Sequence, residues 1–260
     1  MSDGFRTDPV GGGASPPYTG DKYSFDADLT FTGKVRTSPG RYSLEENFLQ
    51  LPNENSTISI VYNLDFELLG MNADIADFSW DTTAGGVKLE TGSADNDQVI
   101  ILPHLDTKQT AWTGVLWGTE NQVVWEAQLR TSASVANILL WAGLKLTNDP
   151  VIATDNDQIY FRFDTDVALE TTWQVISSIG GTDTTTDSGV TVAASTNYNL
   201  RIEVDSARKA HFYINDALVY ITTALTNDID LIPYVGVQQL SSGDASVTLC
   251  YEKISRIIFE

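Results

Sequence analysis

The chain has 260 residues, a length that allows one large β domain or two small ones. Its composition is 42% hydrophobic and 10% aromatic, which supplies material for a core and excludes disorder throughout the chain. The formal net charge of -20 would repel phosphate backbones and anionic lipid, so we expect no nucleic-acid partner and no membrane partner.

Cys250 is the only cysteine, so no disulfide can form within the chain. The first residues, Met-Ser-Asp-Gly-Phe-Arg, lack the apolar stretch of a signal peptide, and no apolar run reaches membrane-spanning length. We therefore expect synthesis in a cytoplasm without a secretory leader.

Residues 1–22 are rich in glycine, proline and serine and offer little that could build a core. We expect an extended N-terminal arm or anchor segment over residues 1–50, followed by one β domain over residues 51–260. Residues 23–50 carry spaced apolar side chains that fit either a short helix or an anchor on the main domain. The arm residues expected to contact a partner subunit are Phe5, Pro9, Pro16, Pro17 and Tyr18.

Strand patterns begin at Ser56 and continue to the end of the chain. Residues 99–102 form a continuous apolar run, which predicts a strand covered on both faces. Residues 123–130 alternate between apolar and polar, which predicts a strand with one buried face. The stretch from Trp173 to Ile179 predicts the first arm of a hairpin, with a loop over residues 180–189 and a return strand from Val190.

The clearest pattern runs from Tyr198 to Ile221. Three alternating apolar segments are joined by short polar turns, and Asn215-Asp216 is a pair that tolerates positive φ. The pattern predicts an antiparallel meander with Ile202 and Phe212 in the core.

The whole chain shows about twelve strand patterns at intervals of about ten residues, with almost no helical periodicity between them. Even spacing of short strands with polar turns is typical of sandwiches and jelly rolls. The sequence therefore predicts an all-β fold, a two-sheet antiparallel β-sandwich of jelly-roll type.

Two acidic loops precede predicted strands, Asp95-Asn96-Asp97 and Asp155-Asn156-Asp157, and we expect both at the same end of the sandwich. Carboxylate and amide oxygens are ligands for calcium, although Asp and Asn are also ordinary turn formers. The candidate calcium ligands are Asp95, Asp97, Asp155, Asn156 and Asp157. We expect no other cofactor.

No motif for nucleophilic or metal-dependent hydrolysis occurs, and His104 and His211 are the only histidines. Glycoside hydrolysis needs two facing carboxylates, and the nearest candidates are Glu203 with Asp205. Glu126 stands alone, and Arg208 occupies the place of a third carboxylate. A solvated strand face explains these residues better, so we expect no enzyme and assign no catalytic residue.

Trp112 and Trp117 flank a short polar and apolar segment. Partly exposed, they would be candidates for stacking on a carbohydrate, whereas the alternative is that both belong to the core of the sandwich.

Several strand and turn motifs occur together from about residue 122 to the C-terminus: Trp125-Glu126-Ala127, Phe161-Arg162-Phe163-Asp164, Trp173-Gln174-Val175, Leu200 to Asp205, Phe212 to Asn215 and Pro233 to Val237, together with Phe48 to Pro52 and Thr113 to Glu120 earlier in the chain. By these motifs the chain resembles the concanavalin A-like jelly-roll domains in virion proteins of tailed phages, marine phages among them. The resemblance implies a two-sheet β-sandwich and a place in a virion, and it carries over no catalytic residue.

From this resemblance we expect a non-enzymatic capsid decoration or cement subunit on the surface of a phage head, made in the host cytoplasm. Its partners would be the major capsid protein, other virion subunits and further copies of itself. The alternative is a tail-associated or fibre module, lectin-like, that contacts host polysaccharide. A weaker alternative is a glycan hydrolase.

Overall fold

The computed structural model describes residues 22–24, 30–32, 40–54, 65–104, 109–147, 149, 155–168, 170–241 and 243–258. For residues 22–24, 30–32 and 53–54 it describes the backbone alone. The chain divides into two compact units, Met1–Gly40 and Arg41–Glu260. In the first unit, β1 (Lys22–Ser24) pairs antiparallel with β2 (Thr30–Thr32). The arm residues predicted to contact a partner, Phe5, Pro9, Pro16, Pro17 and Tyr18, lie outside the described residues.

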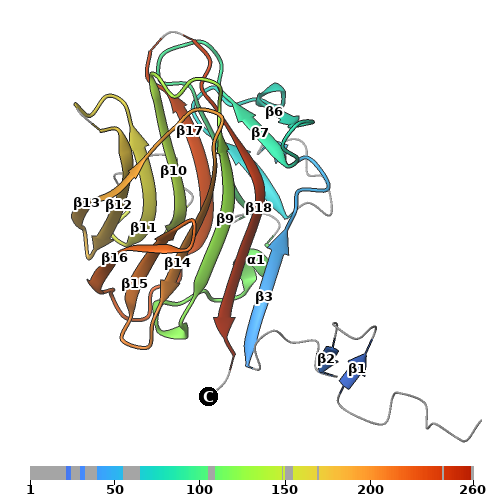
Figure 1. Cartoon of the computed structure of the whole chain (residues 1–260), viewed down its shortest axis with the longest axis vertical. Helices are drawn as coiled ribbons and strands as arrows, with labels where there is room; N and C mark the ends of the chain where they lie inside the picture. The colour runs from blue at the N-terminus through green and yellow to red at the C-terminus, as the bar shows by residue number, and fades with distance from the viewer. Residues whose placement is uncertain are drawn as a thin grey trace, which may run out of the picture. The chain divides into compact units, whose positions relative to one another are not determined.

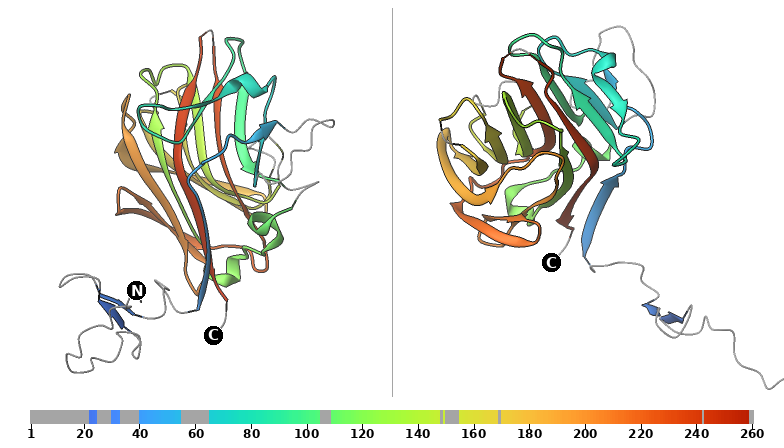
Figure 2. Two further views of the ribbon diagram at one scale, coloured as in Figure 1. Left: turned by 90° about the vertical axis from the view of Figure 1, so that its right-hand side faces the viewer. Right: turned by 45° about the horizontal axis from the view of Figure 1, so that its top comes forward.

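The second unit contains two sheets packed face to face (Figures 1 and 2). We call the first the β10 sheet. Its strands, in spatial order, are β13 (Thr182–Thr191), β12 (Thr172–Ile179), β11 (Gln158–Asp164), β10 (Ile138–Lys145), β17 (Ile232–Gln239), β8 (Gln98–Pro103), β5 (Phe66–Leu69) and β4 (Asn53–Glu54).

The second sheet is named the β9 sheet. Its strands, in spatial order, are β16 (Ala217–Ala224), β15 (Lys209–Ile214), β14 (Asn197–Val204), β9 (Val124–Thr131), β18 (Ser246–Ile257), β7 (Val87–Glu90) and β6 (Phe78–Trp80), and β3 (Arg41–Glu46) also pairs with β18.

Among the described strands, every pairing is antiparallel except the short one between β4 and β5. The predicted all-β fold, a two-sheet antiparallel sandwich, is therefore confirmed. Three helices of one turn, η1 (Ile75–Asp77), α1 (Ala111–Gly114) and η2 (Thr119–Asn121), lie in loops. No helix in the described part of the chain is long and apolar enough to span a membrane.

The boundary of the arm lies ten residues earlier than the expected one, since the first unit ends at Gly40. Residues 41–46 form β3, which pairs with β18 from Arg41↔Ile257 to Glu46↔Glu252. Phe48 is buried beyond the end of this strand. Residues 41–46 are therefore a strand and not a helix, and their pairing with β18 agrees with the alternative of an anchor on the main domain.

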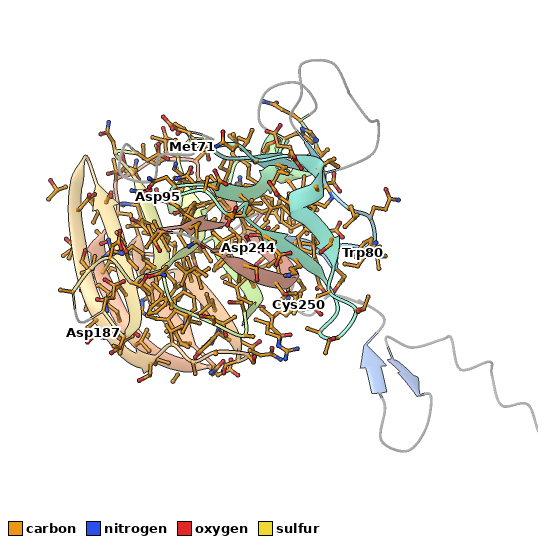
Figure 3. All side chains as sticks on the ribbon, turned by 90° about the horizontal axis from the view of Figure 1, so that it is seen from above. Met71, Trp80, Asp95, Asp187, Asp244 and Cys250 are labelled. Atoms are coloured by element: carbon orange, nitrogen blue, oxygen red, sulfur yellow. The ribbon has the colours of Figure 1, made fainter. Side chains whose placement is uncertain are left out.

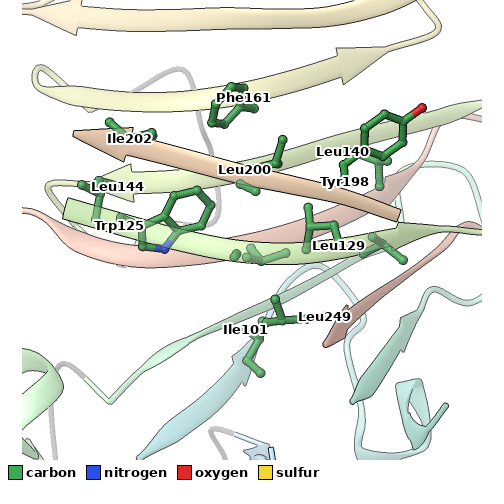
Figure 4. Packing of buried hydrophobic residues seen from close by; sticks show 14 of the residues in the cluster. Ile101, Trp125, Leu129, Leu140, Leu144, Phe161, Tyr198, Leu200, Ile202 and Leu249 are labelled. Atoms are coloured by element: carbon green, nitrogen blue, oxygen red, sulfur yellow. The ribbon is translucent and has the colours of Figure 1, made fainter. Parts of the chain in front are cut away.

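The core lies between the sheets, and Figure 4 shows part of it. Ile202 and Phe212, predicted to be core residues, are opposite each other in the ladder between β14 and β15, and both are fully buried. The predicted meander is β14, β15 and β16. Asn215 and Asp216 adopt φ of 50° and 64° between the last two strands, the backbone that a two-residue hairpin needs.

The predicted loop over residues 180–189 is wrong. Only Gly180 and Gly181 form the turn, with φ of 56° and 81°, and β13 starts at Thr182. Threonine is β-branched and favours extended backbone, so a Thr-rich run beside a strand becomes a strand.

The prediction that the two acidic loops share one end of the sandwich is also wrong. The order β8, β17, β10, β11 is antiparallel at each step, so β8 and β11 run in opposite directions. The loops that precede these two strands therefore lie at opposite ends of the β10 sheet.

The predicted double coverage of residues 99–102 is confirmed, because all four side chains are buried. Val99 and Ile101 belong to the core between the sheets, whereas Ile100 and Leu102 belong to a second apolar cluster on the outer face of the β10 sheet. The cluster also contains Trp141, Tyr160, Ile176, Ile232 and Tyr234. Both faces of the β10 sheet are thus apolar and buried at its centre.

Candidate functional site

The outer face of the β9 sheet is polar and accessible, in contrast to that of the β10 sheet. Side chains of β9 and β14 alternate between buried and less buried positions, and the less buried ones share this outer face. We call it the polar face and define it by the outward residues Lys88, Glu90, Glu126, Gln128, Arg130, Asn199, Arg201, Glu203, His211, Tyr213, Thr248, Tyr251 and Lys253.

Strand register arranges these residues in rows across the sheet. Lys88, Thr248 and Arg130 are opposite one another on β7, β18 and β9. A second row, on β18, β9 and β14, contains Lys253, Glu126 and Arg201. The first row thus combines two basic side chains with a hydroxyl that can donate and accept hydrogen bonds. The second row combines basic side chains with a carboxylate. All of these residues lie on strands.

A hollow of about 550 Å³ lies over the first row. Its floor is formed by strand residues, and its wall includes Asp244, on the loop before β18 (Figure 3). The hollow is lined by Asp81, Thr83, Lys88, Glu90, Arg130, Thr131, Ser132, Ala133, Ser134, Ser195, Asp244, Ser246, Val247 and Thr248.

The Asp81 carboxylate lies at the edge of this hollow and accepts three hydrogen bonds. They come from the Ala84 amide at 2.8 Å, the Thr248 hydroxyl at 2.8 Å and the Thr83 amide at 2.9 Å. Burial raises the pKa of Asp81, but these hydrogen bonds lower it by more. The pKa of Asp81 is therefore below its ordinary value, and the carboxylate is charged at neutral pH.

A smaller hollow of about 220 Å³ lies along β14, lined by Glu126, Asn199, Leu200, Arg201, Asp216 and Tyr251. The Arg201 guanidinium lies over the Tyr213 ring, 4.1 Å from its centroid, and also bonds the Glu203 carboxylate. Between the two hollows, the Gln128 amide donates to the Asn199 side-chain oxygen at 2.8 Å. Amides, charges and a tyrosine ring are thus fixed side by side.

The carboxylates considered for hydrolysis lie on or beside this face, and each contacts a neighbouring basic side chain. Glu203 is paired with Arg201, and Asp205 accepts from His211 Nε2 at 3.0 Å. The His211 bond, with bonds from the Lys209 and Ala207 amides, lowers the pKa of Asp205 despite some burial. A carboxyl group with a lowered pKa is a poor general acid.

Asp155, of the second acidic loop, accepts bonds from the Leu146 and Thr147 amides at 3.1 and 3.0 Å and from the Thr147 hydroxyl at 2.6 Å. Asp157 accepts bonds from the Gly180 amide and from the Thr226 hydroxyl. Asn156 is exposed. These acidic side chains fasten loops to neighbouring strands.

Asp97, of the first acidic loop, accepts a bond from Asn72 at 2.7 Å, and Asp95 is exposed on the surface (Figure 3). Within the described residues, no group of three or more His, Cys, Asp or Glu side chains is arranged to hold a metal ion.

The exposed placement considered for Trp112 and Trp117 is wrong, since their exposed fractions are 3% and 1%. The Trp117 indole donates to the Trp112 carbonyl at 2.7 Å, and Trp112 packs edge-on against Phe66. The alternative interpretation, that both are core residues, is confirmed. Trp112 lies in helix α1, where the Thr110 side chain caps the helix by accepting a bond from the Trp112 amide.

Sequence patterns identified the strands of the polar face but not the face itself as a site. The alternation over residues 123–130 predicts which of its side chains face solvent, Gln128 and Arg130 among them, but it does not show which strands are neighbours. The adjacency of β9, β14 and β18, distant in the chain, brings these residues together.

A family model described as "SO2946-like, C-terminal domain" matches residues 109–249. No curated protein matches the chain. A solved structure of protein SO2946, of unknown function, from Shewanella oneidensis MR-1 has a TM-score of 0.58 and 9% identity, covering 85% of this chain and 89% of that one.

Two further structures carry carbohydrate-related names. The Bacillus licheniformis β-glucanase has a TM-score of 0.52 and 12% identity, with 82% of this chain and 97% of that one covered. The potassium-bound carbohydrate recognition domain of Emp46p has a TM-score of 0.51 and 8% identity, with 73% and 88% covered. At such identities the likeness shows the fold alone.

Proposed function

Because the chain belongs to the family of SO2946-like C-terminal domains and has the concanavalin A-like jelly-roll fold, we propose that it is a non-enzymatic, lectin-like carbohydrate-binding module. The observation that carries the proposal is the polar face, with its two hollows on strands of the β9 sheet. The fold shared with a carbohydrate recognition domain and a glucanase supports it by analogy.

The chemistry of the polar face suits sugar hydroxyls, each of which both donates and accepts hydrogen bonds. Arg201 and Arg130 supply forked donors, Asp81 and Glu126 supply acceptors, and Gln128 supplies both. Side chains on strands hold their geometry better than those on loops, so a ligand loses less free energy in ordering them.

The other large sheet face is a poorer candidate, because its aromatic side chains are covered. Trp141 is 1% exposed and Tyr234 is 2% exposed. A polysaccharide approaching from solvent would therefore meet the polar face first.

We propose no hydrolase on the polar face, because the two carboxylates considered for hydrolysis, Glu203 and Asp205, are each paired. Glu203 bonds Arg201, and Asp205 bonds His211. Hydrolysis needs one carboxyl group kept protonated as an acid and a second one facing it across the substrate. A paired, ionised carboxylate fits hydrogen bonding to hydroxyls instead.

The place of such a module in a virion stays a prediction, as do a capsid partner and assembly with further copies. If the protein is part of a phage particle, a carbohydrate-binding face fits a tail-associated or fibre position in contact with host polysaccharide. A decoration subunit would instead approach the copy number of the major capsid subunit, so the copy number per particle distinguishes the two positions.

The experiment is binding of the purified protein to insoluble polysaccharides and to a glycan array, for the parent and for Arg201→Gln. We expect one class of glycan to be retained by the parent and at least tenfold weaker binding by the variant. Arg208→Gln makes the same charge change in the turn between β14 and β15 and should bind as the parent does. Absence of glycan binding by the parent, or equal loss in both variants, would contradict the proposal.

A further inference from the structure

Two polar side chains are buried together away from the polar face, at the edge of the second apolar cluster. Glu67 lies on β5 and is in register with Leu102 of β8, and His104 follows the end of β8 by one residue. The side chains of Glu67 and His104 are 2% and 9% exposed. They meet on the outer side of the β10 sheet, because their neighbours Leu69 and Leu102 belong to the cluster there.

The two side chains approach each other through one atom each. His104 Nδ1 and Glu67 Oε2 are 3.3 Å apart, the distance of an ion pair when the imidazole is protonated, but the geometry is not that of a hydrogen bond, and His104 Nε2 has no hydrogen-bond partner within the described part of the chain. Glu67 Oε1 has no partner there either. A buried polar group without a hydrogen-bond partner destabilises the fold, and more so when it is charged, so these atoms point to a ligand.

The same chain contains a second histidine–carboxylate pair for comparison. His211 Nε2 and Asp205 Oδ2 are 3.0 Å apart with hydrogen-bond geometry, and Asp205 also accepts two backbone amide bonds. This pair is partly exposed, with side-chain exposures of 24% and 36%. The buried pair is thus the one whose atoms Glu67 Oε1 and His104 Nε2 have no hydrogen-bond partner in the described part of the chain.

We propose that Glu67 and His104 bind a divalent transition-metal ion of the zinc class. Imidazole nitrogen and carboxylate oxygen bind zinc at about 2.0–2.2 Å, so two such ligands at a tetrahedral angle lie about 3.4 Å apart. The 3.3 Å between His104 Nδ1 and Glu67 Oε2 matches this separation.

Two properties of the site follow. Two protein ligands leave at least one coordination position for water or an oxygen of another molecule, so binding should be weaker than at a structural zinc site with four protein ligands. Because the ligands join β5 to the end of β8, a bound ion should stabilise this edge of the β10 sheet.

The experiment is equilibrium dialysis of chelator-treated protein against zinc chloride, with bound metal counted by elemental analysis and thermal melts recorded in parallel. We expect one zinc ion per chain and a rise in Tm for the parent. Glu67→Gln and His104→Gln should each lose at least tenfold in affinity and show no rise in Tm. His211→Gln should behave as the parent does.

The melts without metal show whether each variant is folded. A folded His104→Gln or Glu67→Gln protein that still binds one zinc ion with the parent's affinity would overturn the proposal. So would a parent that binds no zinc, or one whose binding is lost equally in His211→Gln. None of these outcomes depends on glycan binding, so the proposed function is tested separately.

Discussion

Phe161 of the β10 sheet and Phe212 of the β9 sheet meet edge to face across the core, with ring centroids 5.2 Å apart. Both rings are fully buried. The pair joins β11 of one sheet to β15 of the other across the core, and such an aromatic contact adds about 0.5–1.5 kcal/mol beyond the area it buries.

Phe212→Ala should strongly destabilise the protein. Truncating a buried Phe costs about 3–5 kcal/mol, which is a large part of the roughly 5–15 kcal/mol that stabilises a typical domain. Denaturant unfolding of the variant measures this loss. Glu203→Gln on the partly exposed polar face is the control and should change the free energy of unfolding by about 0.5 kcal/mol or less.

Glu252 should make stability depend on pH. This glutamate on β18 is fully buried, and burial raises the pKa of Glu252 from 4.5 to about 8, although a bond from the Trp125 indole lowers it and Glu46 raises it. The folded protein thus holds the proton more tightly than the unfolded chain. The free energy of unfolding therefore falls as pH rises from 4.5 to about 8.

Glu252→Gln should remove this dependence, because an amide keeps the neutral form at every pH. Unfolding measured below and above this window should show a smaller decrease in stability for Glu252→Gln than for the parent. Glu45→Gln, an exposed neighbour on β3, is the matched control and should keep the parent's slope. Equal slopes in parent and Glu252→Gln would show that Glu252 ionises freely in the fold.

Gly236→Ala should destabilise the outer side of the β10 sheet. A Cβ atom at Gly236 would lie 2.4 Å from the Trp141 indole, which covers the glycine closely. Overpacking of this kind costs about 1–3 kcal/mol. Gly114→Ala is the control, since a Cβ there meets nothing within 4 Å, and equal melting temperatures for the two variants would contradict the prediction.

The acidic loop before β11 should act by hydrogen bonding without calcium. Asp155→Ala removes the acceptor for two amides and one hydroxyl, so we expect a loss of about 1–3 kcal/mol. Melts of the parent in chelator and in millimolar calcium should superimpose. A clear rise in Tm with calcium that Asp155→Ala abolishes would restore the calcium hypothesis.

Periodicity predicted the fold well where one face of a strand is buried, as in residues 123–130 and in the meander. It failed for the Thr-rich β13, whose composition predicts a loop, and it left open whether Trp112 and Trp117 are exposed or in the core. The polar face and the Glu67–His104 pair depend on strand order, which brings distant segments together. No local pattern in a single sequence contains that order.

The pairing of β3 with β18 has a mechanical consequence. Arg41, which follows the first unit, lies opposite Ile257, so the chain enters and leaves the β9 sheet at the same end of this ladder. A force between the N-terminal unit and the C-terminal residues would load the β3–β18 hydrogen bonds one after another, as in unzipping. A force between the N-terminal unit and a ligand held on the polar face would load them together in shear, the more resistant direction.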